Sequence, residues 1–507
     1  MTDHLAAARG RLLDGLGPLA AIEIRRRTFN AWLACCALVG LALGAATIAR
    51  EPLSNDEAGT LALVERSFAD FFHQWQGRQN GLLFDIVLWP LVQLFGSSTV
   101  VMRLPALAAV AGAVVFCGLV GARLAGSIVG LIAAALLAVH PSAVYYAQEG
   151  RPYGFVLLFV VVSVWLLLRA LERPSPVRWI VYVLSLAALA YSHDFAILAV
   201  LAHPALVVGH PNRTAQKRFA LALGIPALLV VPLLAFIPEN WGDAAFYWVP
   251  DPDLHQIRAT LGLLTGRQAF ALPIALVLAW ALVSPTARQR ASEVVESVPR
   301  VYAFLSIWVL APTVVLYLVS QFTPVLVPRY AFASVPGICL ALALALGLQR
   351  PRTAVIFASL FVAAFLVRSI DDGVELSKSD WPGAASYLAA SAPPDEPIVV
   401  VGDALFHANA LFYYAPSLGV DRDHLLWKDE ERDRLPDRFV LVGGGGDGDA
   451  LLSVPARSAS AWVVLSHFVT DDVQADLDRL FAACEGAQER TFTNIQIVHL
   501  TGCSPPD

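Results

Sequence analysis

Long apolar stretches follow one another through the first three quarters of this 507-residue chain. Each is close to the roughly 20 residues that an α-helix needs to cross a bilayer. The composition agrees, because 57% of the residues are hydrophobic and only 15% are charged, whereas about a quarter are charged in soluble domains. The sequence therefore predicts an all-α polytopic membrane protein.

About eleven such stretches predict about eleven transmembrane helices. The first starts at Asn30, and the others lie near residues 101–121, 127–147, 154–171, 179–193, 195–209, 219–236, 268–284, 301–320, 331–348 and 353–369. The two between 179 and 209 are short enough to be tilted or to pair as one hairpin. No small-residue cleavage site follows the first stretch, so we expect it to remain as a span.

Basic residues give these helices an orientation. Arg25, Arg26 and Arg27 precede the first stretch and predict that segment 1–29 is cytoplasmic, by the positive-inside rule. Alternate loops are also basic and are predicted to be cytoplasmic, through Arg123, then Arg169, Arg173 and Arg178, then Arg213, Lys217 and Arg218, then Arg288, Arg290 and Arg300, then Arg350 and Arg352. The loop after Arg50 is therefore predicted to be extracytoplasmic. The arginine- and alanine-rich composition is typical of a bacterial protein, and we expect the bacterial plasma membrane.

The run "NGLLFDIVLWPLVQLFG" at 80–96 is an exception to this pattern. Counted as a span, it would reverse the sidedness of every later basic loop. It is short and carries Asp85 and Pro90. We interpret it as an interfacial helix along the outer leaflet, and a true short span is the alternative. The membrane domain then covers residues 30–370.

The composition changes after residue 370. The runs "PIVVVG", "RFVLVGG", "AWVVLSH" and "NIQIVHL" are typical of strands, and "DVQADLDRLFAAC" is typical of a helix. An odd number of spans places residues 371–507 outside, so we predict a C-terminal extracytoplasmic α/β domain. Cys484 and Cys503 would pair there if the compartment is oxidising, and would otherwise stay free.

Several functional classes find no support. The net charge of −6 leaves no basic surface for nucleic acid. The six cysteines form no CxxC or Cys/His cluster, so they indicate neither a zinc site nor a redox motif. The glycine-rich "VGGGGDGDA" matches neither a P-loop nor GxGxxG, and we interpret it as a turn or flexible loop.

Charged and aromatic residues gather in the predicted outward loops. Charges at membrane depth are costly unless they line a polar cavity. They therefore indicate one site, formed by Asp56, Glu149, Arg151, His193, Asp194 and Arg329. The alternative for each residue is that it only marks the end of a loop.

Carboxylates and arginines at a lipid-embedded cavity suit the transfer of a sugar from a phosphate-linked lipid. Arginine binds phosphate oxygens in bidentate geometry and stabilises the charge that remains when the sugar departs. A carboxylate can remove the proton of the attacking hydroxyl. Adjacent helical residues point about 100 degrees apart, so only one of Asp56 and Glu57 can face the reaction. The other is predicted to cap the helix or to contact a basic residue.

A series of motifs resembles the GT-C glycosyltransferases. The acid pair, the helix ending in "LFG", "RLPAL", "HPSAVYYAQEGRPYGFVLL" and "VPRYAFASVPG" are most similar to the bacterial branch related to protein O-mannosyltransferases, the lipid A aminoarabinose transferase and the lipopolysaccharide galacturonosyltransferases. The resemblance covers roughly residues 30–345. It implies an inverting transferase that uses a polyprenyl-phosphate sugar on the extracytoplasmic face.

The resemblance also implies roles for individual residues. Asp56 takes the position of the catalytic carboxylate of the first loop, and Glu149 that of the second loop. Arg151 stands beside Glu149, and Arg329 takes the place of the phosphate-binding arginine of a late loop. We expect Arg151 to bind the donor phosphate together with Arg329. Further expected contacts with donor or acceptor are Glu57, Arg78, Asn80, Tyr153, His193, Asp194 and Tyr330.

The sequence departs from the family pattern at two places. Many relatives carry an acid where this chain has Tyr153, and "GRQNG" replaces the His-Pro-Pro usual before the interfacial helix. The first departure makes Glu149 the second carboxylate, if one is needed, and the second leaves the sugar undetermined. Asp56, Glu149 and His193 could bind a divalent cation, but their spacing does not require one, and we predict no metal and no other cofactor.

The sequence thus predicts a hexosyl- or pentosyltransferase, with mannose or arabinose as the expected sugar and a glycolipid, polysaccharide or protein as acceptor. A transporter or flippase for a lipid-linked sugar is the alternative. A transporter should show internal repeats and charges near the middle of its spans. The charges here lie instead in the loops on one side.

Overall fold

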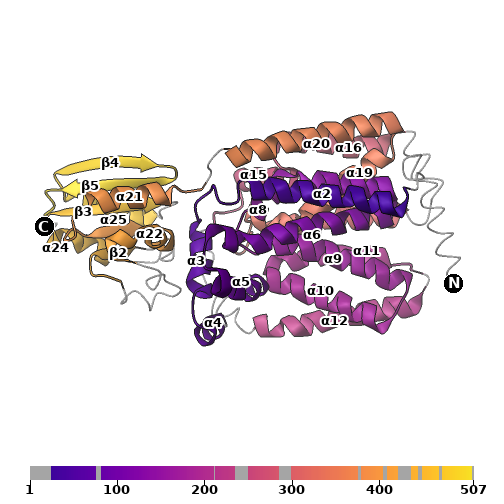
Figure 1. Cartoon of the computed structure of the whole chain (residues 1–507), viewed down its shortest axis with the longest axis horizontal. Helices are drawn as coiled ribbons and strands as arrows, with labels where there is room; N and C mark the ends of the chain where they lie inside the picture. The colour runs from indigo at the N-terminus through magenta and orange to yellow at the C-terminus, as the bar shows by residue number, and fades with distance from the viewer. Residues whose placement is uncertain are drawn as a thin grey trace.

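The computed structural model describes residues 24–75, 81–210, 212–234, 249–284, 298–374, 378–402, 408–420, 435–442, 448–466 and 471–504. Arg78 and Asn80 lie outside these residues. A bundle of long helices and a smaller domain with a β-sheet lie end to end along the long axis of the molecule (Figure 1). We call them the helical bundle and the sheet domain.

Six helical segments in the described part of the chain are long and apolar enough to cross a membrane. They are α2 (Arg26–Ala46), α6 (Thr99–Ala125), α9 (Tyr153–Glu172), residues Arg300–Val319 of α18 (Val298–Val319), η2 (Pro328–Ser334) together with α19 (Val335–Gly347), and α20 (Pro351–Val374). Two bent pairs raise the number to eight. They are α7 (Ser127–Ala138) with α8 (Pro141–Ala147), and α15 (Leu254–Thr265) with α16 (Gln268–Val283).

The sequence explains both bends. Pro141 is the first residue of α8. A proline fits this first position because no N–H is needed there, but it cannot continue a preceding helix, so α7 and α8 are separated. Gly266 ends α15 in the left-handed region, at φ 81°, which glycine adopts without steric cost. The chain turns by 59° at the first break and by 68° at the second.

Three further predicted stretches are helical as well. They correspond to α10 (Pro176–Ser192), to η1 (Asp194–Ala202) followed by α11 (His203–Val207), and to α12 (Arg213–Leu234). The predicted polytopic helical fold is therefore confirmed. Gly154 shows how closely the helices pack, because a Cβ at this position would lie 2.6 Å from the carbonyl oxygen of Ala106.

Three short helices lie at the end of the bundle that faces the sheet domain (Figure 1). They are α3 (Asn55–Val64), α4 (Phe68–Trp75) and α5 (Leu82–Phe95). The last corresponds to the short helix expected at 80–96. Its 14 residues are fewer than a span requires, and it is bounded by Gly81 and Gly96, both with positive φ. We call these helices the rim.

The sheet domain contains five strands in the order β2-β1-β3-β5-β4. Strand β1 (Ile398–Val401) pairs in parallel with β2 (Phe439–Val442) and β3 (Ser460–Ser466), whereas β5 (Ile495–Thr501) pairs antiparallel with β3 and with β4 (Gly486–Phe492). The sequence predicted every strand except β4. That strand lies at the edge and is mostly exposed and polar, so it lacks the apolar pattern of a buried strand.

Short helices surround the sheet. They are α21 (Trp381–Ser391), α22 (Ala408–Tyr414), η4 (Pro416–Leu418), α23 (Gly448–Leu452), α24 (Val454–Arg457) and the predicted α25 (Asp471–Ala482). One apolar cluster continues from the rim into this domain, because Leu53, Leu61 and Phe84 share it with Trp381 and Phe412. The sheet domain is thus packed directly against the rim. Cys484 and Cys503 form a disulfide.

Candidate active site

The start of α3 is fixed by its own sequence. The Ser54 side chain accepts a hydrogen bond from the backbone N–H of Glu57, and the Glu57 carboxylate accepts one from the N–H of Ser54. This capping box satisfies two N–H groups at the helix start. The prediction that one of the two adjacent acids caps the helix is therefore confirmed for Glu57. Nine of the ten residues of α3 are buried, and Asp56 is the exception.

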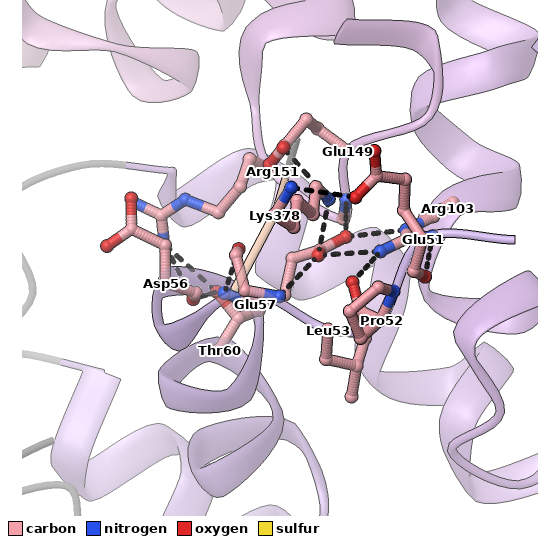
Figure 2. A network of polar contacts seen from close by, with 12 residues as sticks. Glu51, Pro52, Leu53, Asp56, Glu57, Thr60, Arg103, Glu149, Arg151 and Lys378 are labelled. Carbon is pink, nitrogen blue, oxygen red and sulfur yellow. Dashed lines mark hydrogen bonds and ion pairs between the residues drawn. The ribbon is translucent and has the colours of Figure 1, made fainter. Parts of the chain in front are cut away.

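Four buried ionisable side chains form what we call the closed cluster: Glu57, Arg103, Glu149 and Lys378 (Figure 2). Arg103 forms a bidentate pair with Glu57, with Nε 2.7 Å from Oε1 and Nη2 2.8 Å from Oε2. Lys378 Nζ lies 2.8 Å from Glu57 Oε2 and 2.9 Å from Glu149 Oε1. Buried charges of this kind are stable only when they are paired and hydrogen-bonded.

Arg103 also fixes the chain that leads into α3. Its guanidinium donates to the carbonyl oxygens of Ile48, Glu51 and Pro52 at 2.7 to 2.9 Å. Together with the two bonds to Glu57, these three bonds use all the N–H donors of the guanidinium. The segment between α2 and α3 is thereby held by one residue of α6.

The two carboxyl groups of the closed cluster differ in proton affinity. Burial alone would raise the pKa of Glu57, but the charges of Lys378 and Arg103 outweigh it and hold this pKa below its ordinary value. For Glu149 burial dominates and raises the pKa, although Lys378 acts in the opposite direction. Burial would lower the pKa of Lys378, yet both carboxylates raise it. Glu57 is therefore firmly ionised, and Glu149 binds a proton more readily.

A second group of charges, which we call the open cluster, consists of Asp56, Arg151 and Arg329. Asp56 Oδ2 lies 3.9 Å from Arg151 Nη2 and 3.8 Å from Arg329 Nη2. The side chains are partly exposed, at 32% for Asp56 and Arg329 and 16% for Arg151. The closed cluster, in contrast, has its Glu57–Arg103 pair at 0% exposure. The open cluster is thus the one that a ligand can reach.

Arg151 is oriented by α3 itself. Its Nη1 donates to the hydroxyl oxygen of Thr60 at 3.0 Å and to the carbonyl oxygen of Asp56 at 3.3 Å. In Figure 2 Asp56 lies to the left of Glu57 and of the rest of the closed cluster. Burial would lower the pKa of Arg151, but the Asp56 carboxylate raises it. The guanidinium therefore stays charged.

The loop 149–151 connects the two clusters. Glu149 contacts Lys378, the Gly150 N–H donates to Glu57 Oε1 at 2.7 Å, and Arg151 faces Asp56. A Cβ at Gly150 would lie 3.2 Å from Glu57 Oε1 and 3.3 Å from the Met102 carbonyl oxygen. A side chain at this position would therefore require these oxygens to move by a few tenths of an ångström.

Aromatic rings line the region around Arg329. Tyr153, at the start of α9, has its ring centroid 4.6 Å from that of Tyr146 and 5.7 Å from that of His193. The His193 ring lies 5.0 Å from Tyr330, the neighbour of Arg329 in η2. Asp194 begins η1 directly after His193. Three predicted substrate contacts, Tyr153, His193 and Tyr330, thus lie together.

Three residues of the site were not predicted: Arg103 and Lys378 of the closed cluster, and Thr60, which contacts Arg151 of the open cluster. Arg103 was visible as an arginine at the start of a span, in the quoted motif "RLPAL", but it received no role. Lys378 gave no local signal, because its partner Glu57 is 321 residues away in the chain. Thr60 is a small polar residue in a buried helix, and only its contact with Arg151 shows its importance.

No three His, Cys, Asp or Glu side chains among the described residues lie close enough together to share a metal ion. Asp56, Glu149 and His193 are all described and are separated between the open cluster, the closed cluster and the aromatic rings. They do not form the ligand set that their sequence left open.

Comparisons with known proteins agree with this architecture. Residues 79–236 match the family model described as dolichyl-phosphate-mannose-protein mannosyltransferase. No curated protein sequence matches the chain significantly.

Solved structures give a similarity of fold. The apo crystal structure of ArnT from Cupriavidus metallidurans is 13% identical, has a TM-score of 0.55, and covers 93% of this chain and 98% of its own. The structure of ArnT from the same organism bound to undecaprenyl phosphate is 12% identical, has a TM-score of 0.55, and matches 94% of this chain and 99% of its own. A third structure is archaeal oligosaccharyltransferase AglB from Archaeoglobus fulgidus in complex with an inhibitory peptide and a dolichol-phosphate. It is 11% identical, has a TM-score of 0.50, and matches 76% of this chain and 63% of its own. Over residues 79–236 the chain is thus similar to this mannosyltransferase family, and its fold is similar to those of ArnT and AglB.

Proposed function

We propose that the chain transfers a hexose or pentose from a polyprenyl-phosphate donor to a glycolipid, polysaccharide or protein of the cell envelope. The reaction takes place on the extracytoplasmic face of the bacterial plasma membrane. The observation that carries this proposal is the open cluster, in which Asp56 contacts two arginines from different segments, the 149–151 loop and η2. The family match and the undecaprenyl phosphate bound to ArnT support the same donor class.

Arg151 and Arg329 bind the phosphate of the donor. Guanidinium groups match phosphate oxygens in bidentate geometry and remain charged at any physiological pH. As the bond between the anomeric carbon and the phosphate oxygen breaks, its electron pair stays on the phosphate. The two arginines stabilise this charge in a partly buried site, where electrostatic interactions are stronger than in water.

Asp56 is the general base. The acceptor hydroxyl attacks the anomeric carbon from the side opposite the phosphate and loses its proton to Asp56, so the configuration is inverted. The products are the glycosylated acceptor, polyprenyl phosphate and a proton on Asp56. General base catalysis by a positioned carboxylate contributes about 10²- to 10⁴-fold to such a rate.

The remaining predicted residues support this reaction. Tyr153, His193 and Tyr330, with Asp194 beside them, bind the sugar or the lipid next to Arg329. Glu149 orients the donor or acceptor through the 149–151 loop, and Glu57 maintains α3. We propose that the chemistry needs no metal ion, so that transfer persists in the presence of a chelator.

Purified protein in vesicles, supplied with a panel of polyprenyl-phosphate sugars and envelope glycolipids, tests the proposal. We expect one donor to give glycosylated acceptor and free polyprenyl phosphate in equal amounts. No transfer from any donor, together with movement of the lipid-linked sugar across the bilayer, would establish the transporter instead.

A further inference from the structure

The sheet domain is bonded directly to the segment that carries Asp56. Lys378 Nζ donates to the Glu57 carboxylate at 2.8 Å, and the Lys378 N–H donates to the Glu51 carboxylate at 2.9 Å. The Tyr414 hydroxyl accepts a hydrogen bond from the N–H of Leu53 at 2.8 Å. Partners on both sides of Asp56 in the chain are therefore held by residues of a different domain.

Lys378 is the residue that joins these contacts to the open cluster. Its side chain is only 6% exposed and bridges Glu57, next to Asp56, and Glu149, two residues before Arg151. One cation thus holds two of the three segments that supply groups to the open cluster, those that carry Asp56 and Arg151. The bridge is visible in Figure 2, where Lys378 lies between the two carboxylates.

Apolar packing cannot provide the same constraint. The cluster that contains Leu53, Leu61, Trp381 and Phe412 holds the sheet domain against the rim, but dispersion contacts are individually weak and not directional. Charge-assisted hydrogen bonds define distance and direction. They are consequently the contacts that fix the rotation of α3 and the position of Asp56.

We propose that Lys378 is a positioning residue for sugar transfer, and that the docked sheet domain sets the geometry of the open cluster through it. This inference rests on the proposed function. Lys378 acts through Glu57 and Glu149. A misplacement of about 1 Å in a catalytic group can reduce a rate by about 100-fold, so the loss of this cation affects the rate more than the binding of the donor phosphate by the arginines.

The test uses the full chain in nanodiscs and the variant Lys378→Met, which keeps an apolar stem but removes the cation. Lys217→Met is the matched control, because it makes the same change at an exposed lysine of α12. Rates are expressed per binding site for undecaprenyl phosphate, so that misfolded molecules do not count. We expect kcat of Lys378→Met to fall about 10- to 100-fold with the donor KM within about twofold of the parent.

Hydrogen–deuterium exchange gives a readout that needs no activity. In Lys378→Met the peptide over residues 51–64 should exchange at least about fivefold faster, with peptides of α6 and α9 unchanged, because the opening is local. Unchanged exchange over 51–64, an unchanged kcat, or a uniform rise across all helices would overturn the proposal. Faster local exchange in a chain whose parent transfers no sugar would leave the positioning of this segment standing and refute the proposed function alone.

Discussion

Asp56 and Glu57 are neighbours in the chain, yet their carboxylates belong to two different clusters. Glu57 is fully buried and forms a bidentate pair with Arg103, whereas Asp56 is 32% exposed and faces Arg151 and Arg329. The rotation of about 100 degrees between successive helical residues produces this division. One acid therefore maintains the local structure, and the other is available for chemistry.

Replacing Arg329 by Gln should weaken donor binding. A hydrogen bond to a charged group contributes about 1.5–3 kcal/mol, so we expect the donor KM to rise about 10- to 100-fold. Arg329→Lys keeps the charge but loses the planar fork, and should give an intermediate value. Steady-state kinetics with the preferred donor measure both. Arg490→Gln is a matched control, since Arg490 is exposed on β4 of the sheet domain, and an equal effect there would refute phosphate binding by Arg329.

Glu57→Gln should destabilise the protein far more than Glu149→Gln. The first change leaves Arg103 and Lys378 facing a neutral group, and breaking a buried ion pair costs about 3–5 kcal/mol. Glu149 has a raised pKa, so its environment already disfavours the charged form, and we expect its neutral variant to remain within about 1 kcal/mol of the parent. Thermal unfolding in detergent compares the two.

The pH dependence follows from the direction of each shift. The pKa of Glu57 is lowered in the folded state, so its stabilisation is complete above the unfolded pKa and is lost as the pH falls. The difference in free energy of unfolding between the parent and Glu57→Gln should be constant from pH 7 to about 5 and should shrink below about 4.3. The raised pKa of Glu149 has the opposite effect on stability. As the pH falls, protonation removes the free-energy cost of burying its charged carboxylate. A gap that shrinks on raising the pH above 7 would contradict this assignment.

Gly150→Ala should disturb both clusters. The added methyl group would meet Glu57 Oε1 and the Met102 carbonyl oxygen at 3.2 and 3.3 Å, and backbone oxygen of a packed helix cannot move aside easily. We expect a loss of about 1–3 kcal/mol in stability and a slower transfer. Gly224→Ala, where no atom lies within 4 Å of the new Cβ, should be neutral or slightly stabilising. Equal stability and equal transfer rates of the two variants would show that the 149–151 loop can accommodate a methyl group.

Removing the Cys484–Cys503 disulfide should lower the stability of the sheet domain. The bond closes a loop of 19 residues, which corresponds to about 3 kcal/mol in the chain-entropy model. The double variant Cys484→Ser with Cys503→Ser should therefore unfold at a lower temperature, and mass spectrometry of protein from cells should find the parent pair oxidised. Reduced thiols in freshly isolated protein would contradict an extracytoplasmic sheet domain.

The sequence was most informative where a pattern is local. Runs of apolar residues predicted the long helices of the bundle but not α15, and the β-branched runs predicted β1, β2, β3 and β5, because burial dictates hydrophobic side chains at a fixed period. Helix geometry predicted that only one of Asp56 and Glu57 can face the reaction, and the family resemblance assigned that place to Asp56. The edge strand β4 was missed, since an exposed strand carries no apolar signal.

Contacts between distant segments could not be predicted in the same way. Nothing near Lys378 in the sequence indicates that it pairs with Glu57 and Glu149, and its role follows only from the packing of the sheet domain on the rim. The place of Glu149 could not be predicted either, because Arg151, two residues later, faces Asp56 in the open cluster, whereas Glu149 pairs with Lys378 in the closed cluster. A difference of two positions in a tight loop decides which cluster each side chain joins.

The central claim is that Asp56 removes the proton of the acceptor hydroxyl. The most direct test is single-turnover transfer by Asp56→Asn with saturating donor, beside the parent and beside Asp395→Asn, an exposed acid of the sheet domain. We predict that the rate of Asp56→Asn falls about 10²- to 10⁴-fold, while undecaprenyl phosphate still binds and Asp395→Asn retains the parental rate. Transfer by Asp56→Asn at the parental rate would contradict the claim.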